Sequence, residues 1–156
     1  MKPALYVETS VVSYLTARPS RDIITAARQQ LTQKWWRTRG RYELFASQFV
    51  LEEAGAGHKQ AARQRLKALQ GLPLLQLDAE ADALAKLLRR DVPLPERAAV
   101  DALHLAVAVV GGMDYLLTWN FKHLANASLR NKIEDLCRSS GYTPPVICTP
   151  EELLGE

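Results

Sequence analysis

The sequence predicts an α/β fold in which helices flank a mainly parallel β-sheet. Short apolar runs rich in Val, Leu and Tyr alternate with longer stretches whose apolar residues recur with helical period. This alternation is typical of strands joined by crossover helices. The length of 156 residues is usual for one domain, and a hydrophobic content of 47% is ample for a core. We therefore expect residues 1–156 to form a single domain with one active site.

Five apolar runs bounded by turn residues or helix caps are predicted to be strands. They span residues 4–7, 42–46, 72–77, 115–118 and 146–148. Amphipathic stretches predict helices over residues 21–39, 48–54, 58–70, 79–90 and 128–139, with a further helix that begins at Glu96 and ends before Gly111 and Gly112. Another helix follows residue 8, where Thr9 or Ser10 offers a hydroxyl cap.

Three other helix starts carry recognisable capping residues. Ser47 and Asp78 precede helical stretches, where their side-chain oxygens can accept hydrogen bonds from otherwise unpaired backbone amides. The segment TPEE at residues 149–152 combines a capping box with proline at the first helical position. We therefore expect the chain to end on a helical turn.

Charge and composition restrict the function classes only in part. The formal net charge of +3 and the pI near 9.0 permit contact with a polyanion without requiring it. Cys137 and Cys148 lie in no CxxC or metal-binding spacing, which indicates a reducing compartment. No apolar run reaches the length of a membrane span, and the first residues lack the features of a signal peptide. We expect a cytoplasmic protein without membrane contact.

Polar residues beyond two predicted strands are the first candidates for a functional site. Glu8 directly follows the first strand, and Asn120 occupies the matching place after the strand that ends at Thr118. In open parallel sheets, ligands bind in the crevice beyond the carboxyl ends of the strands. Asp101 and His104 share one face of AAVDALHLAVAVV, whose other residues are apolar and which must therefore be buried almost all round.

A buried Asp101 would need a cation, because transfer of an unpaired charge out of water is very costly. Glu53 lies on a short helix whose opposite face is apolar, so it could point at the same crevice. Several carboxylates and an amide oxygen, without a Cys or His cluster, form an oxygen-rich set that suits Mg²⁺ or Mn²⁺. An ion held there could polarise a phosphate and activate water for in-line attack.

For Asp101 and Glu8, a structural role explains the residue almost as well as metal binding does. Asp101 could form a buried salt bridge with Arg97 or with a more distant arginine. Glu8 could stabilise the N-terminus of the helix that it precedes. From spacing alone, both interpretations stay open.

The remaining candidates also have structural alternatives. Glu52 and Glu53 could form a solvated helix face. His104 could be a hydrogen-bonded core histidine rather than a ligand. Asn120 could be a turn or cap residue for the segment that follows it.

Four segments resemble the motifs of PIN-domain nucleases, in the order found in that family. They are YVETSVVSYL, SQFVLEEAGAG, DALHLAVAVVGGMDYLLTWNFKHL and VICTPEELL. Within the family, the chain resembles the VapC-type toxin ribonucleases of toxin–antitoxin pairs. The resemblance implies a three-layer α/β/α fold in which the first strand lies beside the strand that ends at Thr118. The family's acidic positions fall on Glu8, Glu53, Asp101 and Asn120, with Thr9 and Thr118 as supporting residues.

Two site residues depart from the commonest pattern of the family. Glu8 stands where the family more often has the aspartate of Asp-Thr-Asn, and Asn120 stands where it often has aspartate. The spacing of the second motif selects Glu53 over Glu52. We expect the longer side chain and the neutral amide to alter metal binding without abolishing it.

The resemblance implies an RNA substrate, an inhibitory antitoxin and a homodimer as partners. Basic groups near the acids would have to offset the repulsion of phosphates, and Arg97 and Lys122 are the nearest candidates. A basic helix and a tryptophan-containing cluster are further candidates: Lys59, Arg63, Arg65 and Lys67, and Lys34, Trp35, Trp36, Arg37, Arg39 and Arg41. Adjacent tryptophans on a helix face different ways, so we expect at least one in the core.

The leading hypothesis is a Mg²⁺- or Mn²⁺-dependent endoribonuclease, the toxin of a toxin–antitoxin pair. Glu8 and Asp101 would be the principal ligands, Glu53 a ligand or water-orienting base, and Asn120 a support. The alternative is a catalytically weak or inactive PIN module that acts in RNA binding or protein interaction. A nucleotide-binding domain is disfavoured, because no predicted strand is followed by GxGxxG or a P-loop.

Overall fold

The computed structural model describes the chain except for residues 95–98, 121, 123, 125 and 156. Its centre is a five-stranded sheet in which all paired strands are parallel, in the order β3-β2-β1-β4-β5. The strands are β1 (Ala4–Val7), β2 (Glu43–Ser47), β3 (Leu74–Leu75), β4 (Tyr115–Leu117) and β5 (Val146–Cys148). The prediction of an α/β fold with a parallel sheet is confirmed.

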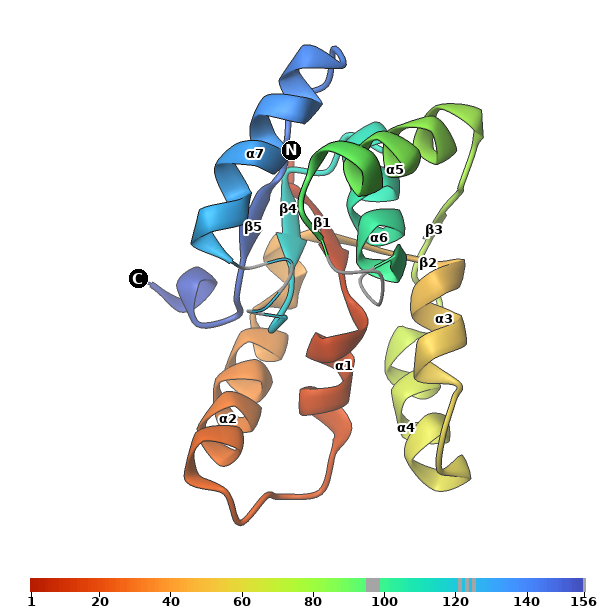
Figure 1. Ribbon diagram of the computed structural model, residues 1–156. Helices are drawn as coiled ribbons and strands as arrows, with labels where there is room; N and C mark the ends of the chain where they lie inside the picture. Colours follow the sequence, from red (N-terminus) through yellow and green to blue (C-terminus); the bar gives the residue numbers. More distant parts are fainter. Residues whose placement is uncertain (95–98, 121, 123, 125, 156) are drawn as a thin grey trace.

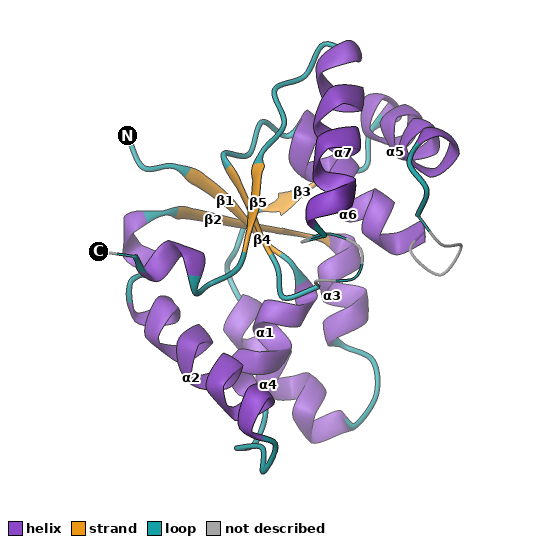
Figure 2. Cartoon of the chain, turned by 60° about the vertical axis from the view of Figure 1, so that its left-hand side comes forward, coloured by secondary structure: helices purple, strands orange, loops and turns teal. Residues whose placement is uncertain are grey.

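Helices flank the sheet and complete the three-layer α/β/α arrangement (Figure 1). In Figure 2, α5, α6 and α7 lie on one side of the strands, and α1, α2 and α4 lie on the other. Among the described residues, no helix combines the length and the apolar character that crossing a bilayer requires. The helices are α1 (Thr9–Thr16), α2 (Ile23–Arg37), α3 (Gln48–Ala54), α4 (Lys59–Leu69), α5 (Ala79–Asp91), α6 (Ala99–Val110) and α7 (Ala127–Ser139), with 3₁₀ turns η1 (Arg39–Arg41) and η3 (Glu152–Leu154).

The sheet reverses its direction of growth at β1. The chain first adds β2 and β3 on one side of β1 and then returns to place β4 and β5 on the other side. The register pairs Leu5 with Tyr115 and Val7 with Leu117, so β1 and β4 end side by side. Such a reversal leaves a crevice beyond the strand ends, because the connections leave in opposite directions there. The predicted neighbourhood of these two strands is confirmed.

The capping signals predicted at Ser47, Asp78 and Thr149 are confirmed. Ser47 Oγ accepts a hydrogen bond from Val50 N at 3.4 Å, and Asp78 Oδ1 accepts one from Ala81 N at 2.8 Å. In the last turn, Thr149 N donates to Glu152 Oε1 at 3.1 Å and Glu152 N donates to Thr149 Oγ1 at 3.3 Å. This reciprocal pair is the predicted capping box, and the turn it opens is a 3₁₀ turn.

Two predicted elements are shorter in the structure by more than one residue at an end. The strand expected over residues 72–77 is confined to Leu74–Leu75 at the edge of the sheet, because Pro73 has no N–H to donate to a ladder. Leu77 beyond it is 42% exposed. The helix expected over residues 21–39 begins after Asp22, whose carboxylate accepts from Thr25 N at 2.9 Å, and it ends at Arg37 before η1.

The apolar helix α6 is buried as its composition predicted. Eight of its residues are buried, Asp101 and His104 among them. It ends at Val110, before the two glycines. Gly112 adopts a φ of +73°, which residues other than glycine rarely adopt. The expected start at Glu96 lies outside the described residues. The buried polar pair therefore sits on the first described turns of a core helix.

We expect Asp78→Ala to lower the free energy of unfolding by about 1 kcal/mol, because it removes the cap of α5. Asp82→Ala, the matched control on the same helix, removes only an exposed ion pair with Lys86 and should cost about 0.3–0.5 kcal/mol. Urea unfolding midpoints of the two variants measure the difference. A larger loss for Asp82→Ala would contradict the capping role of Asp78.

Candidate functional site

The carboxylate of Glu8 accepts several hydrogen bonds where β1 passes into α1. Its Oε1 accepts hydrogen bonds from the hydroxyls of Ser10 and Thr118, the latter at 2.6 Å. Its Oε2 accepts one from Ser10 N at 3.1 Å, which makes Glu8 the N-cap of α1. The expectation that Thr9 or Ser10 caps this helix is wrong. The glutamate side chain is long enough to fold back onto the helix start, and the Ser10 hydroxyl is engaged by Glu8 instead.

The two hydroxyls that hold Glu8 are themselves held by backbone amides. Trp119 N donates to Ser10 Oγ at 2.8 Å, and Asn120 N donates to Thr118 Oγ1 at 2.9 Å. The segment after β4 is thereby tied to the start of α1. Glu8 is only 5% exposed, yet these donors satisfy much of what its carboxylate lost on leaving water.

Glu53 reaches the same place from the last turn of α3. Its Oε1 accepts hydrogen bonds from Thr9 Oγ1 at 2.6 Å and from His104 Nε2 at 2.7 Å. Burial alone would raise the pKa of Glu53, but the hydrogen bonds from His104 and Thr9 and the electrostatic attraction of the imidazole N–H together lower the pKa below its ordinary value. Its carboxylate is therefore ionised at neutral pH.

His104 is a fully buried, hydrogen-bonded histidine, as one of the two interpretations had it. Besides Nε2 on Glu53, its Nδ1 lies 2.6 Å from the hydroxyl of Tyr6, which lies 2.6 Å from Ser47 Oγ. Burial is the main cause that raises the pKa of Tyr6, so the phenol stays protonated and can donate. Because both ring nitrogens have partners, His104 has none left for an ion.

Glu8, directly after β1, and Glu53 of α3 converge although 45 positions separate them in the chain. One potential ligand atom each from Glu8, Glu53 and His104 lies within 4.8 Å of the other two. Each carboxylate has one oxygen, Oε1, with two donors on it. The second oxygen of Glu8 accepts one bond, and that of Glu53 accepts none from the described residues. These two Oε2 atoms are the oxygens best able to accept a cation.

Asp101 and Asn120 form a separate hydrogen-bonded pair. Asn120 Nδ2 donates to Asp101 Oδ1 at 3.2 Å, and Asp101 is 9% exposed. Within the described part of the chain, the group of ligand atoms around Glu8 does not include Asp101. The proposed salt bridge to Arg97 lies outside the described residues. The roles assigned to these two residues therefore stay predictions.

The basic residues suggested for RNA contact are placed only in part. Arg97 lies outside the described residues, and Lys122 is exposed just beyond Asn120. Arg65 of the basic helix donates to the backbone oxygens of Ala54 and Ala56 at 2.8 and 2.7 Å, so it closes the α3–α4 turn. That contact is structural and leaves Arg65 a poor candidate for binding phosphate.

The two adjacent tryptophans face different ways, as expected for a helix. Trp35 is fully buried in the core. Trp36 is partly exposed, but the guanidinium of Arg39 lies over its ring at 4.4 Å from the centroid. This cation–π contact covers one ring face that a nucleobase would need. The prediction that at least one tryptophan belongs to the core is confirmed.

Sequence reasoning missed three residues that organise the site. Ser10 and Tyr6 contact the acids or their partners, and Trp119 donates from its indole Nε1 to Thr32 Oγ1 at 2.8 Å while its backbone amide holds Ser10. Tyr6 lies in an apolar strand, where nothing in the sequence distinguishes it from a core aromatic. The hydroxyl of Ser10 was visible in the first motif and was interpreted only as a cap.

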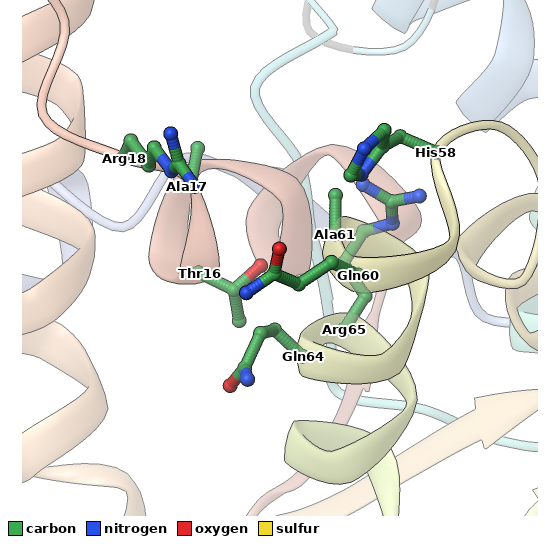
Figure 3. A pocket seen from close by; sticks show the side chains of 8 residues that line it. All are labelled: Thr16, Ala17, Arg18, His58, Gln60, Ala61, Gln64 and Arg65. Atoms are coloured by element: carbon green, nitrogen blue, oxygen red, sulfur yellow. The ribbon is translucent and has the colours of Figure 1, made fainter.

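A cavity of about 460 Å³ lies between the end of α1 and α4 (Figure 3). Its lining residues are Thr16, Ala17, Arg18, His58, Gln60, Ala61, Gln64 and Arg65. No carboxylate and none of the predicted metal ligands contributes to it. The cavity is therefore distinct from the cluster of Glu8, Glu53 and His104.

A family model described as the PIN domain matches residues 5–127, which is most of the chain. The chain belongs to the PIN-domain family. This PIN domain is also similar to a chain in the crystal structure of VapBC2 from Rickettsia felis bound to a DNA fragment from their promoter. The TM-score is 0.55 at 15% identity, covering 94% of this chain and 98% of that chain, and likeness at this identity concerns the fold alone. A search of curated proteins found no match.

We expect the stability that Glu53 contributes to disappear in acid. Its folded pKa lies below the ordinary value of 4.5, so the contribution is present above pH 4.5 and is lost as pH falls through the folded pKa. Melting temperatures of the parent and Glu53→Gln, measured from pH 7 to pH 3 in EDTA, should differ near neutrality and converge in acid. A difference that grows as pH falls would contradict the lowered pKa.

Proposed function

We propose that this PIN domain, acting as a single domain over residues 1–156, is a metal-dependent endoribonuclease that cleaves single-stranded RNA. The supporting observation is the convergence of Glu8 and Glu53, whose ligand atoms lie within 4.8 Å of each other at the switch point of a PIN-domain sheet. Two carboxylates so close together repel each other, and a cation between them would relieve that repulsion. Binding of a catalytic ion would explain why Glu8 and Glu53 converge.

The donor set fits Mg²⁺ or Mn²⁺. Both acids present oxygen ligands, which hard divalent cations prefer. No described Lys or Arg forms an ion pair with Glu8 or Glu53, so their negative charge is available to a cation. When bound, a divalent ion supplies positive charge that polarises a phosphodiester and eases deprotonation of water.

The chain's own residues have distinct tasks in this proposal. Glu8 and Asp101 are the principal ligands, and Glu53 either joins them or accepts a proton from the attacking water. Asn120 supports Asp101 through its amide N–H. Thr118 fixes Oε1 of Glu8 and Thr9 fixes Oε1 of Glu53, so each carboxylate is held in one orientation.

We propose that the protein acts as the toxin of a type II toxin–antitoxin pair. This role is supported by PIN-family membership and by the likeness of the fold to a chain of the VapBC2 complex. RNA is then the substrate, with Arg97 and Lys122 as proposed phosphate contacts, and a cognate antitoxin and a second copy of the chain are the proposed partners. A cytoplasmic location agrees with Cys137 and Cys148, whose thiols are free and buried.

One contact favours a second candidate, a catalytically weak or inactive PIN module that binds RNA or protein. The position that is often aspartate in the family is Asn120, whose amide points a donor at Asp101. A neutral group there lowers the negative charge that would attract an ion. Binding of single-stranded RNA by the parent without cleavage in Mn²⁺ would favour this candidate.

Mn²⁺ should raise the melting temperature of the parent, because the ion binds the assembled site and not the unfolded chain. At a hundredfold excess over its dissociation constant the gain is about 2.7 kcal/mol. Thermal melts in EDTA, in millimolar Mn²⁺ and in a monovalent salt of equal ionic strength separate binding from screening. A melting temperature indifferent to Mn²⁺ would count against the site.

Glu53→Gln should reduce Mn²⁺-dependent cleavage of single-stranded RNA on the order of 10²–10⁴-fold, the range for loss of a general base. Glu52→Gln is the matched control, because it removes the same charge from the exposed neighbouring residue and should cleave like the parent. Initial rates with purified, folded variants, each with an EDTA control, give the comparison. Parental activity in Glu53→Gln would refute its catalytic assignment.

A further inference from the structure

A histidine at the centre of a helix as apolar as α6 has to be explained. His104 is fully buried between core residues, and an aliphatic side chain would fill that position without any polar atom to satisfy. The ring is nevertheless bonded at both nitrogens, at 2.6 and 2.7 Å. Tyr6 and Phe49 also flank it, with ring centroids 5.7 and 6.2 Å away. The imidazole is therefore fixed in position and in rotation.

The hydrogen bonds around His104 form one consistently directed series. Val50 N–H donates to Ser47 Oγ, and valence then allows Ser47 to donate to the oxygen of Tyr6 and Tyr6 to donate to His104 Nδ1. A neutral imidazole that accepts at Nδ1 carries its proton on Nε2 and donates it to Glu53. Every donor in the series has an acceptor, and the last acceptor is the carboxylate.

This series ties both ends of α3 to the same imidazole. Ser47 is the N-cap of α3, and Glu53 lies in its last turn. The whole helix has only seven residues. Tyr6 anchors the arrangement on β1, the central strand, directly before Val7 and Glu8. A change in the tilt of α3 would break a contact to His104 at one end or the other. The placement of Glu53 relative to Glu8 therefore depends on His104.

We propose that His104 is a positioning residue for Glu53. Its Nε2–H, together with the Thr9 hydroxyl, occupies both lone-pair directions of Oε1 and leaves Oε2 as the oxygen that binds the cation. This inference rests on the proposed function, because it assumes that Glu53 serves a bound ion. It adds a residue outside the four acidic positions, with Tyr6 as its anchor.

Binding of Mn²⁺ alone, followed by the electron paramagnetic resonance signal of the free ion, tests the proposal on the full chain. His104→Leu removes the donor and should weaken Mn²⁺ binding roughly 10–100-fold, the range found when the hydrogen-bond partner of a metal ligand is lost. His104→Gln places an amide N–H near the position of Nε2 and should restore most of the affinity. Tyr6→Phe leaves the imidazole but removes its anchor, and should weaken binding less than His104→Leu.

A merely structural role would give a different pattern. Ile133→Ala controls for lost core packing, because it opens a cavity beneath α7, away from the site. Its fold is verified by circular dichroism, and its Mn²⁺ affinity should equal that of the parent. In RNA cleavage at saturating Mn²⁺, His104→Leu should lower kcat with KM nearly unchanged, because Glu53 and not RNA binding is affected.

The outcomes separate this proposal from the proposed function. Parental Mn²⁺ affinity in His104→Leu overturns the positioning role alone, and so does an affinity of His104→Gln as low as that of His104→Leu. If His104→Leu does not fold, parental affinity in Tyr6→Phe overturns it instead. A parent that binds no Mn²⁺ at all overturns the proposed function and this inference with it.

Discussion

The parallel pairing of β1 with β4 is the constraint on which the candidate site depends. Glu8 and Thr118 are 110 positions apart in the chain, yet the pairing of Val7 with Leu117 brings them to adjacent strand ends. Because side chains alternate between the faces of a sheet, a slip of one residue would turn the Thr118 hydroxyl away from the carboxylate. The geometry around Glu8 is therefore a consequence of register.

Hydroxyl and imidazole donors, rather than Lys or Arg side chains, serve these two acids among the described residues. Ser10 and Thr118 serve Glu8, and Thr9 and His104 serve Glu53. A salt bridge would also have offset the cost of desolvation, but it would have cancelled the charge that a cation needs. Hydroxyl donors stabilise the ionised carboxylate while the local charge stays negative. The site thus combines fixed carboxylates with the negative charge that the proposed divalent ion would need.

The short helix α3 shows how tertiary contacts support local structure. A helix of seven residues is too short to be stable alone in water, because the cost of nucleation is spread over few hydrogen bonds. Here its start is capped by Ser47, its end is tied through Glu53, and the Arg65 guanidinium binds the carbonyl of Ala54. Each contact comes from a different element. Glu53 is consequently presented by a helix that the fold holds in place.

The sequence by itself determined the α/β class, most element positions, and the caps at Ser47, Asp78 and Thr149, because those depend on periodicity and on hydrogen bonds within a few residues. Resemblance to a family selected Glu8 and Glu53, which the structure does bring together. Only the tertiary structure decided that Thr118 holds the carboxylate of Glu8 and that Tyr6 and His104 hold the carboxylate of Glu53 in place. Those contacts join residues far apart in the chain, and they follow from strand order and register, which no local pattern of residues contains.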